Sequence, residues 1–391
     1  MMSDMDVCPE INKRLLSRRA VLALTSGAIM LPPDPAAAGP FRKRIAVGAI
    51  RWDAWEAEGS KVLDSVENTL GPRKYWERAP FCGTPSQNES ISFSRCDTQA
   101  AMDDEIGFAS RAGLAYWAYC WYGASNPMMN AWAHHQSSAH REAIRWCLLL
   151  QFSRLGGPAG FSMAQREYIG YLKQSNYQCV IGSRPLIYIY FDQVAHLQSE
   201  WGGNWDTLRT ALSDFAEACL QAGLSRPYLV VMRGAPAGAA ETAKQISADA
   251  ISNYIARVPS GAASPYSALD TLTRAYWLEM ASTGLAIVPI CMTGWDTRPR
   301  QERPPSWEMP QRSTGEPKPY VAAGSPSQIG AHIRAGVDFV SGHSATCPAE
   351  TLLVYSWDEC DEGGSPLVPH WSDNGTEHEI LDGVQAALTA R

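Results

Sequence analysis

Short runs of apolar residues alternate along the chain with longer segments in which apolar residues recur at helical spacing. The runs are rich in β-branched and aromatic residues and end in turn residues, which is typical of buried strands. We expect strands at residues 45–50, 113–120, 147–152, 185–190, 228–232, 250–255, 285–292 and 352–355. Strands that alternate with helices indicate βα units and a parallel sheet.

The segments with helical periodicity lie between these strands and after the last one. We predict helices at residues 97–112, 133–145, 162–174, 205–222, 240–247, 267–282, 327–335 and 377–390, the first capped by Asp97. Eight strands with eight helices match a (β/α)8 barrel, so the predicted fold is a single α/β TIM barrel with long βα loops. The strands at 147–152 and 250–255 have the weakest patterns, and a doubly wound open sheet is the alternative.

The first 38 residues have the pattern of an export signal. Arg18 and Arg19 follow Ser17 and precede an apolar run, and small residues around Ala38 offer a cleavage site. The arginine pair resembles a twin-arginine signal. We therefore predict a signal peptide at 1–38, a barrel at 39–391, and a periplasmic or secreted protein. No stretch reaches the ~20 apolar residues that a transmembrane helix needs.

Composition narrows the possible partners. A formal net charge of −7 argues against nucleic acid or an acidic membrane surface. Ten cysteines are present, and Cys82 and Cys96 flank a polar loop where they could pair in an oxidising compartment. No CxxC or Cys/His spacing indicates structural zinc, so we predict neither a metal nor a cofactor.

An acidic segment follows the last predicted strand. Residues 355–364 read Tyr-Ser-Trp-Asp-Glu-Cys-Asp-Glu-Gly-Gly, with four carboxyl groups within five positions. Like charges repel, so crowded carboxylates are unfavourable unless some are protonated, paired or used. A tryptophan beside two carboxyl groups offers a sugar site a flat apolar face and acid/base groups. A solvated acidic loop is the alternative.

Polar and aromatic residues also follow the other predicted strands, and in a barrel all these strand ends meet at one face. The predicted substrate-binding residues are Trp52, Asp53, Trp121, Tyr122, Asp192, Arg233, Tyr254, Trp295, Asp296 and Trp357, beside the predicted catalytic Glu359 and Glu362. Structural alternatives stay open: core packing for the strand-end aromatics, a helix cap for Asp296, and an Asp192–Arg233 salt bridge. Residues 296–326 are predicted to form a long βα loop over the site or irregular surface.

Three segments together resemble a known family. Residues 355–363 are similar to the Trp-Asn-Glu-Trp-x-Glu-Gly signature of glycoside hydrolase family 99 and the related WbsX-type proteins. Residues 294–300, Gly-Trp-Asp-Thr-Arg-Pro-Arg, resemble the WbsX-type Gly-Trp-Asp-x-x-Pro-Arg segment, and residues 102–106 with 113–122 resemble the family's helix and second strand. Asp358 stands where the signature has Asn, and Cys360 where it has its second Trp.

The resemblance implies a (β/α)8 barrel that acts on glycans. In that family the two signature glutamates are the catalytic pair, which fall here on Glu359 and Glu362. The first assists the sugar's own 2-hydroxyl in displacing the leaving group through an anhydro-sugar, and the second is the general acid and later the base. The resemblance therefore implies a retaining glycoside hydrolase, and the signal pattern at 1–38 implies that it is exported; no cofactor is expected. The departures at Asp358 and Cys360 leave mannose specificity open.

Two other functions remain possible. The altered signature permits a non-catalytic glycan-binding protein of the same fold. A glycan-assembly role, resembling a glycosyltransferase, would require a site for a nucleotide diphosphate, and the sequence contains no Gly-rich phosphate loop. The sugar, the linkage and the oligomeric state are not indicated.

Overall fold

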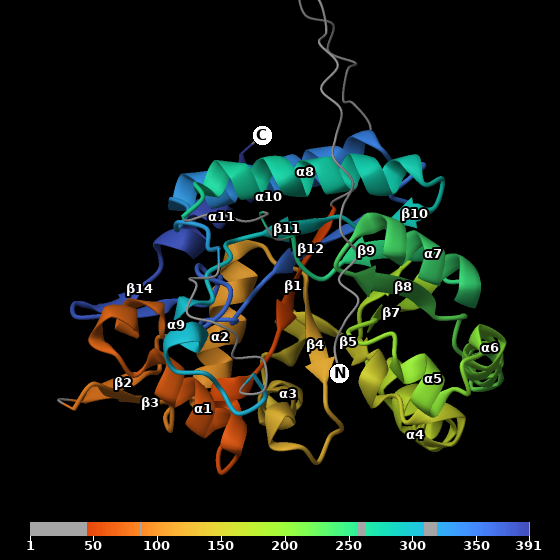
Figure 1. The fold of residues 1–391 in the computed structure, drawn as a ribbon, viewed down its shortest axis with the longest axis horizontal. Helices are drawn as coiled ribbons and strands as arrows, with labels where there is room; N and C mark the ends of the chain where they lie inside the picture. The colour runs from red at the N-terminus through yellow and green to blue at the C-terminus, as the bar shows by residue number, and fades with distance from the viewer. Residues whose placement is uncertain (1–44, 87, 257, 259–262, 309–318, 391) are drawn as a thin grey trace, which may run out of the picture. The chain divides into compact units, whose positions relative to one another are not determined.

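The computed structural model describes residues 45–86, 88–256, 258, 263–308 and 319–390. The predicted signal peptide, and residues 309–318 of the predicted loop, lie outside them. In these residues a parallel sheet curls into a barrel with helices around it (Figure 1). Its strands are β1 (Ala46–Arg51), β4 (Tyr116–Trp121), β5 (Arg145–Gln151), β7 (Arg184–Tyr190), β8 (Tyr228–Arg233), β9 (Ala250–Asn253), β10 (Ala286–Ile287), β11 (Ile290–Met292) and β12 (Thr351–Tyr355).

Two short strands close the barrel. β10 pairs with β9 and β11 pairs with β12, and only Val288 and Pro289 separate them. The Val288 N–H donates to the Ile251 carbonyl at 2.9 Å, and the Pro289 carbonyl accepts from Leu353 N–H at 3.0 Å. The two strands therefore occupy one position, which is the strand predicted at 285–292. The α/β barrel prediction is confirmed, and the open-sheet alternative is excluded.

The helices predicted from periodicity are present with shifted ends. They are α2 (Gln99–Ala112), α3 (Asn130–Ser137), α4 (Gly157–Leu172), α6 (Trp205–Gln221), α7 (Pro236–Ile246), α8 (Tyr266–Ser282), α10 (Pro326–Gly342) and α11 (Glu379–Thr389). The helix predicted at 133–145 was wrong in its second half, because Arg145 already belongs to β5. The cap of α2 is Thr98, whose side chain accepts from the Ala101 N–H, rather than Asp97.

Several short elements were not predicted. They are α1 (Lys61–Leu70), α5 (His196–Glu200), α9 (Arg298–Glu302), β6 (Cys179–Val180), the hairpins β2 (Thr84–Ser86) with β3 (Ser90–Ser92) and β13 (His370–Ser372) with β14 (Gly375–Glu377), and the 3-10 turns η1 (Ala54–Glu56), η2 (Arg73–Arg78), η3 (Pro127–Met129), η4 (Arg141–Ala143), η5 (Phe152–Arg154) and η6 (Ile181–Ser183). Among the helices of the described part of the chain, none is long and apolar enough to cross a membrane.

Cys82 and Cys96 form a disulfide, a pairing that the sequence left open. The bond closes a loop that contains the β2–β3 hairpin, and β3 packs against α1.

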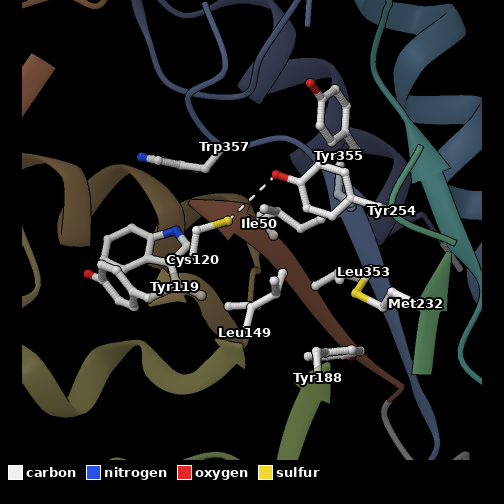
Figure 2. Packing of buried hydrophobic residues seen from close by; sticks show 14 of the residues in the cluster. Ile50, Tyr119, Cys120, Leu149, Tyr188, Met232, Tyr254, Leu353, Tyr355 and Trp357 are labelled. Atoms are coloured by element: carbon white, nitrogen blue, oxygen red, sulfur yellow. Dashed lines mark hydrogen bonds between the residues drawn. The ribbon is translucent and has the colours of Figure 1, made fainter. Parts of the chain in front are cut away.

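Buried side chains fill the barrel in layers. In the lower layer the Tyr116 hydroxyl bonds to the Tyr188 hydroxyl at 2.8 Å and to Thr351 Oγ1 at 3.0 Å. Above it lie Ile50, Cys120, Leu149, Met232 and Leu353, and then Tyr254 and Tyr355 nearer the strand ends (Figure 2). The interior is therefore a packed core and not a channel, and any site must lie at the mouth.

Gly48 in β1 leaves room for the Tyr116 ring, because an added Cβ would lie 2.2 Å from Tyr116 Cζ. We expect Gly48→Ala to lower the free energy of unfolding by about 1–3 kcal/mol through overpacking. Gly170→Ala, in α4 with nothing within 4 Å of the added carbon, is the control and is expected to be neutral or stabilising by up to ~1 kcal/mol. Urea unfolding measures both, and equal effects would contradict the packing argument.

Candidate functional site

Glu359 lies in the loop that follows β12, at the end of the barrel where active sites form. Glu359 is 4% exposed. The Tyr254 hydroxyl donates to Glu359 Oε1 at 3.1 Å, and Arg300 Nη2 lies 3.6 Å from Oε2. The Ser356 hydroxyl accepts from the Glu359 N–H at 3.1 Å and fixes the backbone. The carboxyl group is thus held by the residue that follows β9, by α9 and by its own loop.

Burial raises the pKa of Glu359 from 4.5 to about 7, against the opposing effects of Arg300 and the Tyr254 hydroxyl. A carboxyl group that titrates near neutral pH is suited to proton transfer at that pH. Such a shift is also a marker of functional sites, because ordinary surface carboxylates stay ionised.

Arg300 brings Glu359 and Glu362 to one guanidinium group. The arginine is anchored by Asp361, with Nε at 2.9 Å from Oδ2 and Nη2 at 2.8 Å from Oδ1. Arg300 Nη1 also contacts Glu362 Oε2, and lies 3.6 Å from Glu308 Oε1. The Glu362 side chain is 18% exposed, so it is the more accessible of the two glutamates.

Aromatic rings line the mouth beside these carboxyl groups. The Arg300 guanidinium lies 5.1 Å from the Trp52 ring centre, and Trp52 Nε1 donates to the Tyr122 hydroxyl at 2.8 Å. Trp307 meets Trp52 edge to face at 5.9 Å and is 39% exposed. A cavity of about 370 Å³ that borders Tyr122 is also lined by Trp121 and Tyr168, on the α4 side of the strands, and Glu359 and Glu362 are not among its lining residues. Trp52 and Tyr122 therefore lie beside the Arg300 group, and their role in substrate binding stays a prediction.

Tyr254 is held rigidly next to Glu359. Its ring stacks on Tyr190 with centroids 4.2 Å apart and planes 13° apart. Its hydroxyl also lies 3.5 Å from Cys120 Sγ in the barrel interior (Figure 2). Because the ring cannot turn freely, the hydroxyl points at the Glu359 carboxyl group.

Arg300, Trp307 and Tyr190 were missed in the sequence interpretation. Arg300 ends the Gly-Trp-Asp-Thr-Arg-Pro-Arg segment, so its place in that motif was the available signal. Trp307 lies in an irregular proline-rich stretch, which gave no such signal.

Three predicted substrate-binding residues lie away from the mouth and were interpreted wrongly. Trp357 is fully buried, packs 5.2 Å from the Trp117 ring, and donates from Nε1 to Glu105 at 2.6 Å. Asp53 is buried against Arg51, whose Nε donates to it at 2.7 Å. Trp121 points outward from β4 into a cluster of rings and is 4% exposed. Their side chains pack in the layer between the strands and the surrounding helices.

Asp296 and Trp295 hold the loop after β11. Asp296 accepts from Arg298 Nη2 at 2.6 Å and lies 3.2 Å from Arg78 Nη1, while its N–H donates to the Glu362 carbonyl at 2.8 Å. Trp295 is 6% exposed and packs near Tyr355. Trp295 thus matches its structural alternative, core packing, whereas Asp296 pairs with two arginines and the N-cap of α9 is Thr297. The arrangement positions the Glu362 backbone.

Asp192 and Arg233 do not form the salt bridge that was offered as an alternative. Asp192 accepts from the Ser153 N–H at 3.1 Å and contacts the Ser153 hydroxyl. Arg233 Nη1 lies 3.5 Å from the Gly238 carbonyl and 3.3 Å from Thr242 Oγ1, at the start of α7. Neither residue is joined to the Glu359–Arg300 group by the contacts of the described residues.

In the described residues no group of three or more His, Cys, Asp or Glu side chains is arranged to hold a metal ion. The chemistry available at the mouth is therefore that of two glutamates, an arginine, a tyrosine hydroxyl and exposed aromatic faces.

No protein-family model matches the chain, and no curated protein matches it. Among solved structures, the family 99 endo-α-mannosidase of Bacteroides thetaiotaomicron is similar, with a TM-score of 0.51 and 9% identity over 87% of this chain and 94% of that one. A second structure of that enzyme gives a TM-score of 0.49 and 11% identity over 87% and 95%. A chitinase from the same organism gives 0.35 and 12% over 89% and 97%. The first comparison shows a glycosidase-like barrel fold.

The raised pKa of Glu359 should make the stability of the protein depend on pH. Its folded-state pKa lies above the unfolded value, so its contribution is complete below about pH 4.5 and is lost as pH rises through about 7. We expect the free energy of unfolding of Glu359→Gln, relative to that of the wild type, to rise by about 3 kcal/mol between pH 4 and pH 8. Denaturant unfolding at both values measures this gain. Glu217→Gln, at an exposed ion pair, is the control, and a gain no larger than the control's would refute the shift.

Proposed function

We propose that the protein is an exported glycoside hydrolase that cleaves a glycosidic bond in an oligo- or polysaccharide with Glu359 and Glu362. The observation that supports this most strongly is the meeting of both carboxyl groups at Arg300, at the mouth of a glycosidase-like barrel. One group is buried with a pKa near neutral pH and the other is open to solvent. The aromatic rings of Trp52, Tyr122 and Trp307 supply apolar faces of the kind that bind sugar rings.

The roles follow the resemblance and give a retaining reaction. Glu359 takes the proton of the sugar 2-hydroxyl, whose oxygen attacks the anomeric carbon, and Glu362 protonates the departing oxygen. Water then opens the anhydro-sugar: Glu362 takes a proton from the water, and Glu359 returns its proton to the 2-oxygen. A pKa of about 7 suits Glu359 as the base near neutral pH.

Arg300 imposes a condition on this reaction. While Nη1 contacts Glu362, the positive charge favours the ionised form of that carboxyl group. Proton donation by Glu362 therefore requires that Nη1 leave it when the sugar binds. Asp361 holds the other side of the guanidinium, through Nε and Nη2, so Nη1 can change partner without release of the arginine.

The same contact favours the non-catalytic alternative, a glycan-binding protein. An arginine that stays on both glutamates would leave them unable to transfer protons, while the aromatic faces would still bind sugar. The glycosyltransferase alternative has no comparable support.

Export is a further part of the proposal. The disulfide between Cys82 and Cys96 fits an oxidising compartment such as the periplasm. The twin-arginine-like segment at 1–38 provides the proposed route.

We expect Glu359→Gln and Glu362→Gln each to lower the rate of glycan cleavage by about 10²–10⁴-fold, because each removes a proton-transfer group. The measurement is product release from a panel of α-linked glycans, with Glu217→Gln as the control that should match the wild type. Unchanged rates in either glutamine variant would contradict the proposal. Sugar binding without turnover in the wild type would establish the binding-protein alternative.

A further inference from the structure

A second buried arginine, Arg51, is the last residue of β1 and lies behind the mouth. It forms ion pairs with four carboxyl groups. Arg51 is fully buried. Its Nη2 lies 2.6 Å from Asp53 Oδ1 and 2.9 Å from Glu56 Oε1, its Nη1 lies 2.8 Å from Glu105 Oε2, and its Nε lies 3.7 Å from Asp358 Oδ2. All four side chains are at most 3% exposed. We call these five residues the Arg51 cluster.

The charges of the Arg51 cluster do not balance if every carboxyl group is ionised. Within the described residues, Arg51 is the cation that forms ion pairs with these four groups. The other titratable neighbours are neutral near pH 7: burial lowers the pKa of His135 to about 3 and raises the pKa values of Tyr119, Cys120 and Cys360 well above their usual ranges. Uncompensated buried charge is strongly unfavourable, so protons must be held inside the cluster.

Two buried oxygens without a hydrogen-bond partner indicate which carboxyl groups carry these protons. Asp358 Oδ2 and Glu56 Oε2 are buried and have no hydrogen-bond partner as acceptors. Each belongs to a carboxyl group that faces a second one: Asp358 is within hydrogen-bond reach of Asp53, and Glu56 of Glu105. Two carboxylates cannot hydrogen-bond to each other, but a carboxylic acid can donate to a carboxylate. A proton on each orphaned oxygen would satisfy it.

We propose that Asp358 is a neutral carboxylic acid at neutral pH that donates a hydrogen bond to the Asp53 carboxylate. Glu56 stands in the same relation to Glu105. The direction of the pKa shift agrees, because burial and the neighbouring Asp53 charge raise the pKa of Asp358 well above its usual range.

The proposal makes Asp358 a positioning residue for the mouth. Its Oδ1 accepts from the Trp52 N–H at 2.9 Å, and Asp358 directly precedes Glu359. The Trp357 N–H donates to the Ile50 carbonyl at 2.8 Å in the same region. Asp358 therefore joins the end of β1, where the Trp52 ring lies, to the loop that carries Glu359 and Glu362. Its effect on rate depends on the proposed function, whereas its protonation does not.

Asparagine tests the protonation, because its amide has nearly the shape of the neutral acid, with NH₂ in place of the O–H donor. We expect Asp358→Asn to keep the fold, and to abolish part of the infrared carbonyl band of protonated carboxylic acids in the wild type at pH 7. Because the wild type takes up this proton on folding, the melting temperature of Asp358→Asn relative to wild type should rise from pH 4 to pH 8.

Asp361→Asn is the control, because Asp361 is fully buried but both of its carboxyl oxygens accept hydrogen bonds from Arg300, so neither oxygen lacks a partner. It should lower the melting temperature at pH 7. Because Asp361 also raises the pKa of Glu359, the infrared comparison is made in a Glu359→Gln background, where Asp361→Asn should leave the band unchanged. An Asp358→Asn variant that keeps the whole band, or that is destabilised more at pH 8 than at pH 4, would overturn the proposal. These two readouts need no substrate, so they stand even if the protein proves not to be a hydrolase.

The positioning role is tested separately, by hydrolysis of the glycan that the wild type cleaves. Asp358→Leu should lower the rate at least tenfold, and Asp358→Asn should restore most of it. Equal loss in both variants would refute positioning by a neutral acid. If Asp358→Leu does not fold, Asp358→Asn alone tests the positioning role. A tenfold loss of rate in Asp358→Asn would refute positioning by a neutral acid.

Discussion

The acidic segment after β12 is buried, and the rest of the mouth is arranged to make that possible. Asp358 and Asp361 are fully buried and Glu359 is 4% exposed. Four carboxyl groups within five residues cannot be ionised together in such a place without nearby cations. Two buried arginines supply the positive charge, Arg51 on the helix side of the strands and Arg300 on the mouth side. Both contact more than one carboxyl group, so each also joins separate parts of the chain.

The aspartates and the glutamates of this acidic segment have different roles. Asp358 and Asp361 alternate with Glu359 and Glu362 along the chain, and the aspartates hold the structure while the glutamates face the mouth. Asp361 fixes Arg300 from below, and Thr69 of α1 donates to the same carboxylate at 3.1 Å. Asp358 links the segment to β1 through the Trp52 N–H. A neutral Asp358 would present an O–H donor and an acceptor oxygen, much as an asparagine side chain presents an amide donor and a carbonyl acceptor.

The barrel was predictable because each βα unit repeats a strong local pattern. Even the strand at 285–292, which the structure divides at Val288 and Pro289, was found as one apolar run. The end of α3 was misplaced because Arg145 is polar yet belongs to β5. Short helices such as α5 and α9, of five residues each, depend on tertiary contacts, and periodicity over so few residues cannot reveal them. In contrast, α1 spans ten residues with Ser60 as its N-cap and one buried apolar face, so its signal was present in the sequence and was missed.

The candidate site was only partly predictable, because strand position does not reveal which way a side chain points. Trp52 and Tyr122 face the mouth, whereas Trp121, one residue from Tyr122, faces the helices, as the period of two requires. Arg300 carries the key contacts, but its partners lie about sixty residues away in the chain. Trp357 was assigned to the sugar because of its neighbours in sequence, and its burial against Trp117 could be known only from the fold.

The central claim is that Glu359 and Glu362 act together on a glycosidic bond. Proton NMR of the sugar anomeric signals, recorded while the protein is incubated with a cleavable α-linked oligosaccharide, tests it most directly. The account predicts that the first product formed has the same anomeric configuration as the substrate. Product of inverted configuration, or a glycan that binds and remains intact, would contradict it.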